Sequence, residues 1–368
     1  MDRPWIEAGL KYAKISKSDL PCLLVQRVAR IRAKNTLNQK FLKCIIGSLG
    51  FTEYVLSIQT GTAVPHISTN QIKQFQFLCP PIEEQKAIAN ILSTLDDKIE
   101  LNRRMNETLE AIARALFKAW FVDFEPVRAN MENRPSESAS PEIAKLFPSE
   151  FENGIPKGWT NGTVGDLATI SKRTISPNKF QNEDFNHFSI PAFDERHRPK
   201  LEEGSLIQSN KFLIEKDSVL VSKLNPRIFR VWTVYAPKEN RCIASTEFII
   251  YQPQHKDYWS FLNSLMRSDE IISKFQQQVT GTSSSHQRVR PESTLSLDIT
   301  IPSEETAKVF NKIMSAVYLQ IEELIEQSQN LSQIRDSLLP RLIAGKIRVS
   351  ELDGCYNAAS RGVLEECK

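Results

Sequence analysis

The sequence is poor in the residues and motifs that catalytic and metal-binding proteins need. Its six cysteines contain no C-x-x-C pair, and its five histidines show no metal-binding spacing. It has no phosphate-binding loop of the G-x-x-x-x-G-K-[ST] kind. The segment Cys79-Pro80-Pro81-Ile82 lacks the polar first residue and the aromatic last residue with which an amino-methyltransferase holds a flipped base. We therefore predict a protein with no catalytic residues, metal ligands or cofactor.

Long apolar runs and an N-terminal leader are also missing. No uncharged apolar stretch approaches the roughly 20 residues that a membrane helix needs. No basic segment followed by an apolar one starts at Met1. Together with the cysteine pattern, this predicts a cytoplasmic protein without a membrane partner. A composition of 40% hydrophobic and 25% charged residues is ordinary for a globular chain, and 368 residues suffice for two cores.

The chain repeats itself at a nearly constant offset. Residues of the first copy recur without gaps 220 positions later, in the pairs Cys22/Cys242, Phe41/Phe261, Thr60/Thr280, Gly61/Gly281 and His66/His286. After a two-residue insertion the offset becomes 222, as in Phe75/Leu297, Pro80/Pro302, Ile99/Ile321 and Leu116/Leu338. Such a match indicates two copies of a whole domain plus a helix. The second copy begins near Ile155, so we expect roughly 65 residues of the first domain to be missing.

Two segments carry the apolar stripe of a long helix. Residues 82–120 place apolar side chains at steps of three and four, and residues 303–345 repeat the pattern. Phe124-Glu125-Pro126 and Gly345 are expected to end these helices, and Pro340 to kink the second. At about 1.5 Å per residue, each rod would be on the order of 55–60 Å long. The two rods could pair antiparallel as a spacer, or they could be ordinary core helices of one bundle.

The other segments predict a linker and an α+β domain. Residues 126–154 contain four prolines and a serine-rich run, which is typical of a linker at a domain boundary. From Trp159 to Pro302, short β-rich runs surround a helical stretch at about 258–279. The predicted parts are the end of a first domain (1–81), a helix region (82–125), the linker (126–154), a second domain (155–302), a C-terminal helix (303–350) and a tail (351–368).

Several of these segments together carry a family resemblance. They are Leu24-Val25-Gln26-Arg27-Val28-Ala29-Arg30, Pro80-Pro81-Ile82-Glu83-Glu84-Gln85, Leu146-Phe147-Pro148, Ile155-Pro156-Lys157-Gly158-Trp159 and Leu338-Leu339-Pro340-Arg341-Leu342. In this combination the chain resembles the specificity subunit of type I restriction-modification systems. The resemblance implies two target-recognition domains, the first one partial, separated by long helices that form an antiparallel coiled-coil spacer. It also implies three kinds of partner: double-stranded DNA, methyltransferase (modification) subunits and restriction/translocase subunits.

Positive charge gathers in the globular segments. Residues 1–50 contain ten Lys and Arg against three Asp and Glu, whereas residues 82–119 contain six against seven. This distribution suits domains that face a polyanion. Solvated surface lysines would explain the charge equally well.

Two segments of the second copy, 223–230 and the loop 280–290, combine cations, amides and hydroxyl groups. Arg, Asn and Gln can pair with base edges, whereas Lys, Ser and Thr mostly hold phosphates. The predicted DNA-contact residues are Lys223, Asn225, Arg227, Arg230, Thr282, Ser283, Ser284, Gln287, Arg288 and Arg290. A turn at Asn225-Pro226 and a flexible serine loop are the structural alternatives. The analogous segments of the first copy are residues 2–6 and 60–66.

The sequence therefore predicts a non-catalytic reader of DNA sequence that brings methyltransferase and restriction subunits to a split target. Two other functions stay open. One is an interaction protein whose coiled coil binds other proteins, and the other is an inactive remnant of a truncated specificity gene. A steep fall of binding with salt would separate the DNA reader from the interaction protein.

Overall fold

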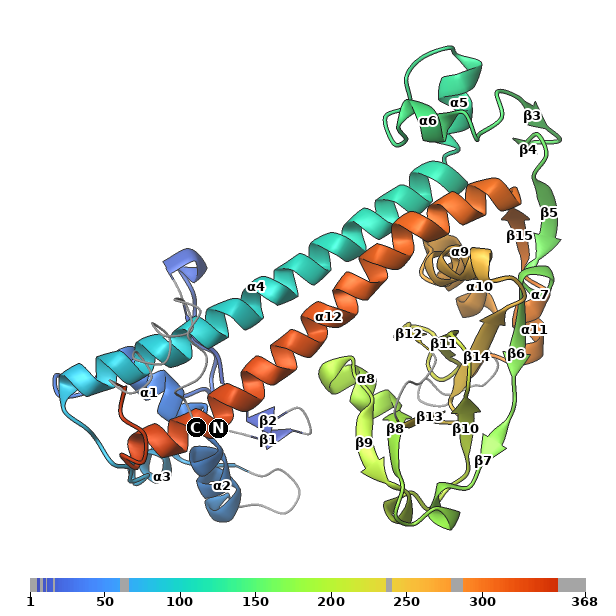
Figure 1. Ribbon diagram of the computed structural model, residues 1–368. Coiled ribbons are helices and arrows are strands. Elements are labelled where there is room, and N and C mark those ends of the chain that lie inside the picture. The colour runs from blue at the N-terminus through green and yellow to red at the C-terminus, as the bar shows by residue number, and fades with distance from the viewer. Residues whose placement is uncertain are drawn as a thin grey trace, which may run out of the picture. The chain divides into compact units, whose positions relative to one another are not determined.

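The computed structural model describes residues 5–6, 9–10, 12–15, 17–59, 66–235, 240–278 and 287–349 (Figure 1). The chain divides into two compact units, Met1–Asn106 with Glu322–Lys368, and Glu107–Ile321. Both division points lie inside the long helices α4 (Ile82–Phe121) and α12 (Glu304–Ile343). Each unit therefore holds one part of each helix. The domain limits predicted from the repeat lie at other residues than these two division points, and they stay a prediction.

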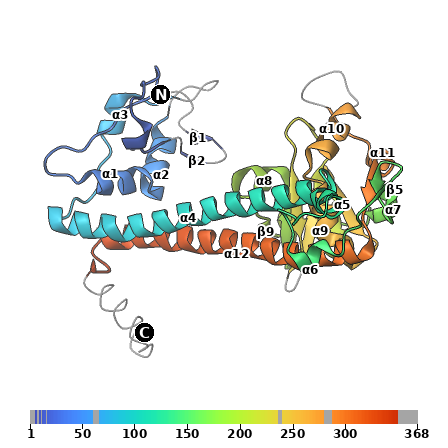
Figure 2. The ribbon, with the colours of Figure 1, turned by 90° about the horizontal axis from the view of Figure 1, so that it is seen from above.

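The helices α4 and α12 confirm the two predicted rods, and each has forty residues (Figures 1 and 2). In the first unit they run antiparallel. Arg335 Nη1 contacts Asp96 Oδ1 at 2.9 Å, and Asn102 Nδ2 donates to Gln327 Oε1 at 2.8 Å, so residue numbers rise along α4 as they fall along α12. The side chain of Asn102 is fully buried, and its Oδ1 has no hydrogen-bond partner. A buried asparagine that bonds across a helix pair in this way can fix the register between the two helices.

Helix α12 ends just before Gly345, the residue predicted to end it. Helix α12 continues past Pro340, and Gly345 then adopts φ +64°, a conformation that glycine accepts without strain. Gly345 N donates to Leu342 O at 3.1 Å, and Lys346 N donates to Arg341 O at 2.9 Å. These two bonds are the Schellman pattern, which satisfies the last carbonyl groups of a helix.

The helices reproduce the sequence repeat residue by residue. The equivalent helices are α1 (Gln39–Ile46) and α9 (Trp259–Leu265), α2 (Leu49–Ile58) and α10 (Asp269–Gln277), and α3 (Thr69–Lys73) and α11 (Pro291–Leu295). The first two pairs begin 220 residues apart, whereas α3 and α11, like α4 and α12, begin 222 residues apart. The insertion therefore precedes α11.

This register changes one predicted equivalence. Ile67 and Val289, 222 residues apart, are 1% and 2% exposed and occupy the same place before α3 and α11. At this offset His66 is equivalent to Arg288. The predicted equivalence of His66 with His286 is therefore wrong, because the insertion comes earlier than the shared histidines suggest. His286 itself lies outside the described residues.

The second copy confirms the predicted α+β domain. It contains a five-stranded sheet in the order β7-β10-β13-β8-β9 and a four-stranded sheet in the order β12-β11-β14-β6. The strands are β6 (Ala168–Ser171), β7 (Thr174–Ile175), β8 (Asp184–Phe188), β9 (Lys200–Glu203), β10 (Lys211–Ile214), β11 (Ser218–Ser222), β12 (Val231–Val234), β13 (Arg241–Ala244) and β14 (Phe248–Pro253). Only β13 and β8 pair parallel among them. Apolar residues of both sheets share one core that includes Phe188, Ile214, Leu220, Trp232 and Ile250.

Short elements complete the described chain. They are β1 (Trp5–Ile6), β2 (Gly9–Leu10), β3 (Phe151–Glu152), β4 (Ile155–Pro156), β5 (Thr160–Thr163), β15 (Asp298–Ile301), α5 (Glu125–Met131), α6 (Pro141–Ala144), α7 (Val164–Leu167), α8 (Ile190–Arg196), and the 3₁₀ turns η1 (Lys17–Asp19), η2 (Pro177–Lys179), η3 (Gly204–Leu206) and η4 (Lys256–Tyr258).

The Ile-Pro-Lys-Gly-Trp segment fixes the start of the second copy on α4. Gly158 adopts φ +83°, and Trp159 N donates to Pro156 O at 3.0 Å, which closes a tight turn. The Trp159 ring lies 5.8 Å from that of Phe121, whose ring meets Phe310 of α12 edge-on at 4.8 Å. The motif thus delivers a buried aromatic side chain to the helix pair.

Residues 126–154, which the composition predicts to be a linker, are ordered, and their place at a domain boundary stays a prediction. They contain α6 and most of α5, and Val127, Ala129 and Phe147 are buried. The serine-rich run is ordered because Ser136 Oγ and Ser138 Oγ donate to Glu125 Oε2 at 2.5 and 2.7 Å. Composition alone gave no sign that one carboxylate would collect these hydroxyl groups.

Replacing Glu125 by Gln is expected to remove a pH-dependent stabilisation of this segment. Burial raises the pKa of Glu125, but hydrogen bonds from Ser136, Ser138, the backbone of Glu137 and Arg134 lower it to about 2. A carboxylate with a lowered pKa stabilises the fold above its unfolded pKa of about 4.3, and this stabilisation is lost as the pH falls towards 2. Hydrogen-exchange protection of residues 126–147 should therefore fall between pH 5 and pH 2.5 in the wild type.

The Glu125→Gln variant should start with lower protection at pH 5 and change less. Glu137→Gln is the matched control, because Glu137 is exposed and contributes only its backbone N–H to the cluster. It should keep the pH dependence of the wild type. Equal protection of Glu125→Gln and wild type at pH 5 would contradict the role of the carboxylate.

Candidate nucleic-acid interface

Two of the predicted DNA-contact segments lie side by side in the second copy. The loop Lys223–Phe229 joins β11 to β12, and the segment Gln287–Arg290 precedes α11. An antiparallel bridge links Leu224 to Arg288. Backbone hydrogen bonds from Asn225 N to Gln287 O (2.8 Å) and from Val289 N to Lys223 O (3.0 Å) complete the pairing. We call these two segments, Lys223–Phe229 and Gln287–Arg290, the double loop.

The fold holds the first segment of the double loop in one shape. Ser222 N donates to Arg230 O at 3.0 Å and closes the base of the loop. Asn225 adopts φ +52°, which Asn tolerates better than most residues, and its carbonyl accepts from Ile228 N at 2.9 Å. The Phe229 ring packs edge-on against Phe275 of α10 at 5.4 Å. The backbone of Asn225 therefore forms the turn that was the structural alternative to a DNA contact. The side chain of Asn225 is half-buried.

The double loop carries four of the predicted cations: Lys223, Arg227, Arg288 and Arg290. Arg227 and Arg290 are exposed, and within the described part of the chain neither forms an ion pair. Lys223 is half-buried, with its charge near Glu292. Such a group of cations on paired loops can meet several phosphates at once.

Arg288 is already held in a two-pronged ion pair. Its Nη2 lies 2.9 Å from Glu247 Oε1, and its Nε lies 3.2 Å from Glu247 Oε2. The side chain of Arg288 is 54% exposed, so this pair stands at the surface. The carboxylate keeps the guanidinium plane oriented, in the geometry that also suits two acceptors on a guanine edge. The sequence gave no sign that Glu247 belongs to this site. Only its contact with Arg288 in the fold identifies it as part of the interface.

Arg230 does not belong to the interface. Its side chain is 9% exposed, and its Nε and Nη2 lie 2.6 and 2.7 Å from the two carboxylate oxygens of Asp194 in α8. Its Nη1 donates to Ile228 O at 3.1 Å. Nε, Nη1 and Nη2 of Arg230 are therefore each engaged within the protein. The prediction that Arg230 contacts DNA is corrected to a structural role that ties α8 to the start of β12.

The remaining predicted contacts cannot be placed. Thr282, Ser283 and Ser284, in the loop 280–290, lie outside the described residues, and so does most of the analogous first-copy segment 60–66. They stay a prediction.

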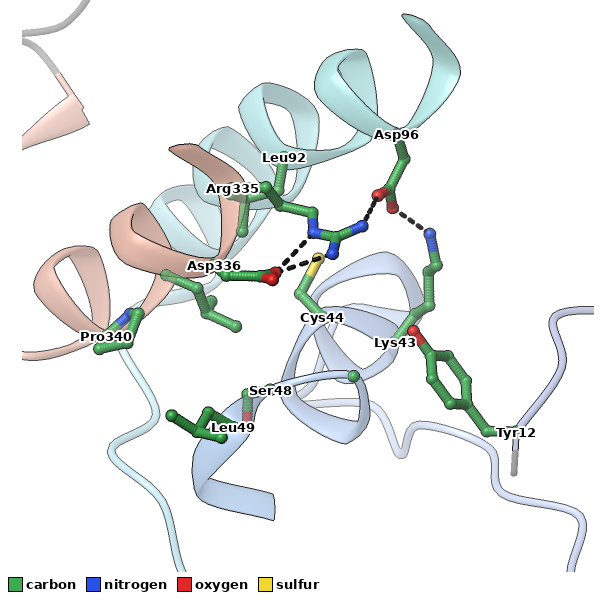
Figure 3. A pocket seen from close by; sticks show the side chains of 12 residues that line it. Tyr12, Lys43, Cys44, Ser48, Leu49, Leu92, Asp96, Arg335, Asp336 and Pro340 are labelled. Carbon is green, nitrogen blue, oxygen red and sulfur yellow. Dashed lines mark hydrogen bonds and ion pairs between the residues drawn. The ribbon is translucent and has the colours of Figure 1, made fainter. Parts of the chain in front are cut away.

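A pocket of the first unit carries a further polar cluster, lined by side chains of α1, α4 and α12 (Figure 3). Asp96 pairs with both Lys43 and Arg335, and Arg335 Nη2 also lies 2.8 Å from Asp336. Burial raises the pKa of Asp96, but its two cationic partners more than offset this and lower it. Burial raises the pKa of the Cys44 thiol, which makes it a poor nucleophile. With two cations facing two carboxylates, the cluster is balanced within the protein.

In the second copy, an arginine occupies a position that lines this pocket in the first copy. Gly47 is equivalent to Arg267, which donates from Nη2 to Val231 O at 3.1 Å and from Nη1 to Asn263 O at 3.1 Å. Tyr318 stands at the position of Asp96, and the Arg267 guanidinium lies 5.9 Å from its ring centre. In both copies a half-buried cation contacts a side chain of a long helix, Lys43 with Asp96 of α4 and Arg267 with the Tyr318 ring of α12, so we assign the pocket a structural role.

The described residues also bear on metal binding and on membrane insertion. Among those residues, no three His, Cys, Asp or Glu side chains are grouped so that they could hold a metal ion. In the same part of the chain, no single helix is long and apolar enough to cross a membrane, although α1 and α2, bent by 58°, pass that test as a pair.

The chain is thus built from two copies of a unit that continues into a long helix, and its α+β copy carries paired cationic loops. The family model for the type I restriction modification DNA specificity domain matches residues 7–111 and 156–333. The chain therefore belongs to the type I restriction modification DNA specificity family. The two matched segments end at equivalent residues of the repeat, 111 and 333.

Curated relatives of the chain include specificity subunits. The type I restriction enzyme MjaIX specificity subunit of Methanocaldococcus jannaschii is 25% identical over 357 residues, which cover 94% of this chain and 77% of that one. The HindI specificity subunit of Haemophilus influenzae is 27% identical over 382 residues, covering 85% and 78%. Among solved structures, the type I S subunit from M. genitalium aligns with a TM-score of 0.49 at 15% identity, over 83% of this chain and 73% of that one.

Proposed function

We propose that this chain is the DNA sequence-specificity subunit of a type I restriction-modification complex. It reads a split double-stranded target and directs methyltransferase and restriction subunits to it, and it contributes no catalytic residue. The family membership supports this function, and so do specificity-subunit relatives that align over most of this chain. The observation that carries the DNA contact is the double loop, in which backbone pairing joins the segment of Arg227 to the segment of Gln287, Arg288 and Arg290. The cytoplasmic location stays a prediction.

The paired helices are proposed to act as the spacer between the two recognition domains. Support comes from both ends of the pair. In the first unit α4 meets α12 through Asn102 and Gln327, and in the second unit Phe117 and Phe121 pack on Phe310. Forty helical residues extend about 60 Å, which exceeds one turn of DNA, about 34 Å. The separation of the half-sites would then be set by helix length.

Removing Arg227 is expected to weaken DNA binding on all sequences and to lower its salt dependence. Each phosphate contact contributes a slope of about 0.9 to the fall of log K with log salt. The complex of this chain with methyltransferase subunits, titrated with target DNA between 50 and 200 mM salt, gives this slope for the wild type, Arg227→Ala and a control. Lys256→Ala is the matched control, because Lys256 is exposed and follows the C-terminal end of β14. Glu247, which contacts Arg288 of the double loop, lies at the opposite end of that strand.

We expect Arg227→Ala to lower the slope by about one and Lys256→Ala to leave it unchanged. Salt-independent binding of the wild type would favour the protein-interaction alternative. Equal effects of the two variants would contradict the placement of DNA on the double loop.

A further inference from the structure

The end of the four-stranded sheet that carries the double loop also carries a lysine from another strand. In this sheet β11, β14 and β6 lie side by side and alternate in direction. The C-terminal ends of β11 and β6 therefore lie at the same end of the sheet as the N-terminal end of β14. Lys223, the first residue of the double loop, directly follows β11, and Lys172 directly follows β6. The sheet thus places Lys172 at the end that carries the double loop.

The stretch Gln287–Glu292 crosses this end of the sheet. Arg288 forms the bridge of the double loop and pairs with Glu247, which directly precedes β14. Four residues later, Glu292 in α11 forms an ion pair with Lys172. The stretch therefore passes from the double loop beside β11 to the end of β6, and it brings Lys172 to the same surface.

The ion pair of Lys172 with Glu292 stands in water. Its side chains are 60% and 66% exposed. The hydrogen bond from Lys172 lowers the pKa of Glu292, and so does the nearby charge of Lys223. Glu292 is therefore charged at neutral pH, and its carboxylate serves both lysines. An ion pair exposed to this degree is weak and is screened by salt, so a phosphate can replace the carboxylate on Lys172.

The spacing and the charge of this surface suit a row of phosphates. Neighbouring strands lie about 4.8 Å apart, so the ends of β11 and β6, two spacings apart, are about 10 Å from each other. One strand of B-DNA carries a phosphate about every 3.4 Å along the helix axis. Lys172 and Lys223 can therefore contact different phosphates of the same DNA strand. The double loop, Lys172, Glu247 and Glu292 together contain five cations and two carboxylates, which leaves the surface positive.

We propose that Lys172 is a further DNA-contact residue that binds a backbone phosphate, and that Glu292 holds its ammonium group in the free protein until the phosphate replaces the carboxylate. The DNA backbone would follow the stretch Gln287–Glu292 from Arg227 to Lys172. This role rests on the proposed DNA binding of the double loop, because it extends the same surface. It gives the two partners opposite effects, since Lys172 attracts the phosphate and Glu292 repels it. An ion pair that only stabilised the fold would need both partners alike.

The test compares variants of the two partners in the complex of this chain with methyltransferase subunits, titrated with a mixed-sequence DNA duplex over the salt range used for Arg227→Ala. Lys172→Ala should weaken binding and lower the salt slope by about one. Glu292→Gln should strengthen binding several-fold at the lowest salt, because it removes a negative charge and keeps the shape of the side chain. The matched control pair is Lys157 with Glu150, 57% and 64% exposed. Lys157→Ala and Glu150→Gln should bind as the wild type does.

Acetylation of lysine side chains, read by mass spectrometry, tests the same contact in the unaltered complex. The DNA duplex should slow acetylation of Lys172 several-fold and leave that of Lys157 unchanged. Wild-type binding that does not depend on salt would overturn both this role and the proposed function. With salt-dependent binding and a lowered slope for Arg227→Ala, three results would overturn the role of Lys172 alone. They are a wild-type slope for Lys172→Ala, weaker binding by Glu292→Gln, and acetylation of Lys172 at the same rate with and without DNA.

Discussion

Replacing Arg288 by Ala is expected to weaken binding of the cognate site by about 1–3 kcal/mol and to relax the preference at one base position. Arg288 sits at the bridge between the two segments of the double loop, and its side chain is 54% exposed. Glu247 holds its guanidinium by two parallel contacts of 2.9 and 3.2 Å. The side chain is therefore already oriented before it meets a base edge, which limits the entropy lost on binding. Competition binding of the partner complex at fixed salt measures the effect.

Two companion variants give this experiment its controls. Lys223→Ala should weaken all sequences alike, because a lysine on a phosphate carries no base information. Glu247→Ala should strengthen binding to unrelated DNA, since it removes a carboxylate beside the phosphates, and lower discrimination, since Arg288 loses its support. Undiminished discrimination by Arg288→Ala would remove Arg288 from the base-reading set.

Much of the fold could be predicted because its signals are local or repeated. The apolar stripe of residues 82–120 gave α4 within a residue, and the β-rich runs at 218–221 and 248–251 gave β11 and β14. The repeat carried information as well, since equivalent helices start at a constant offset. Even so, the two histidines at 66 and 286 misplaced the insertion, because a shared residue type in a loop is weaker evidence than the burial of Ile67 and Val289.

What could not be predicted depends on partners distant in the sequence. The sequence predicts that Arg230 contacts DNA, because Arg230 lies in a cationic segment. In the fold, its side chain is buried and paired with Asp194, which is 36 residues away. Arg288 reads the same way and stays at the surface, although Glu247 pairs with it. Nothing in either local sequence separates these two cases. The order of residues 126–154 could not be predicted for the same reason, because it depends on hydrogen bonds from Ser136 and Ser138 to the carboxylate of Glu125.

A seven-residue insertion in both long helices is expected to lengthen the preferred separation of the half-sites by about three base pairs. Seven helical residues add about 10.5 Å, and DNA rises about 3.4 Å per base pair. The insertions belong between Asn106 and Glu107 in α4 and between Ile321 and Glu322 in α12. Placed there, they keep Asn102 beside Gln327 on one side and the Phe121 contact with Phe310 on the other.

The insertion in α4 alone is the control that makes this a test of the spacer. It shifts Phe117 and Phe121 out of register with Phe310, and loss of a buried phenylalanine contact costs about 3–5 kcal/mol. We expect that variant to be unstable, and the matched variant to remain folded. B-DNA turns about 100° over three base pairs, whereas a heptad turns a helix only about 20°. The two domains of the matched variant would therefore not face both half-sites equally well. We expect the matched variant to bind the longer site more weakly than the wild type binds the original site. Mapping of methylated sites with the partner subunits measures the spacing directly. If the matched variant is folded and still methylates sites with the original spacing, helix length does not set the separation.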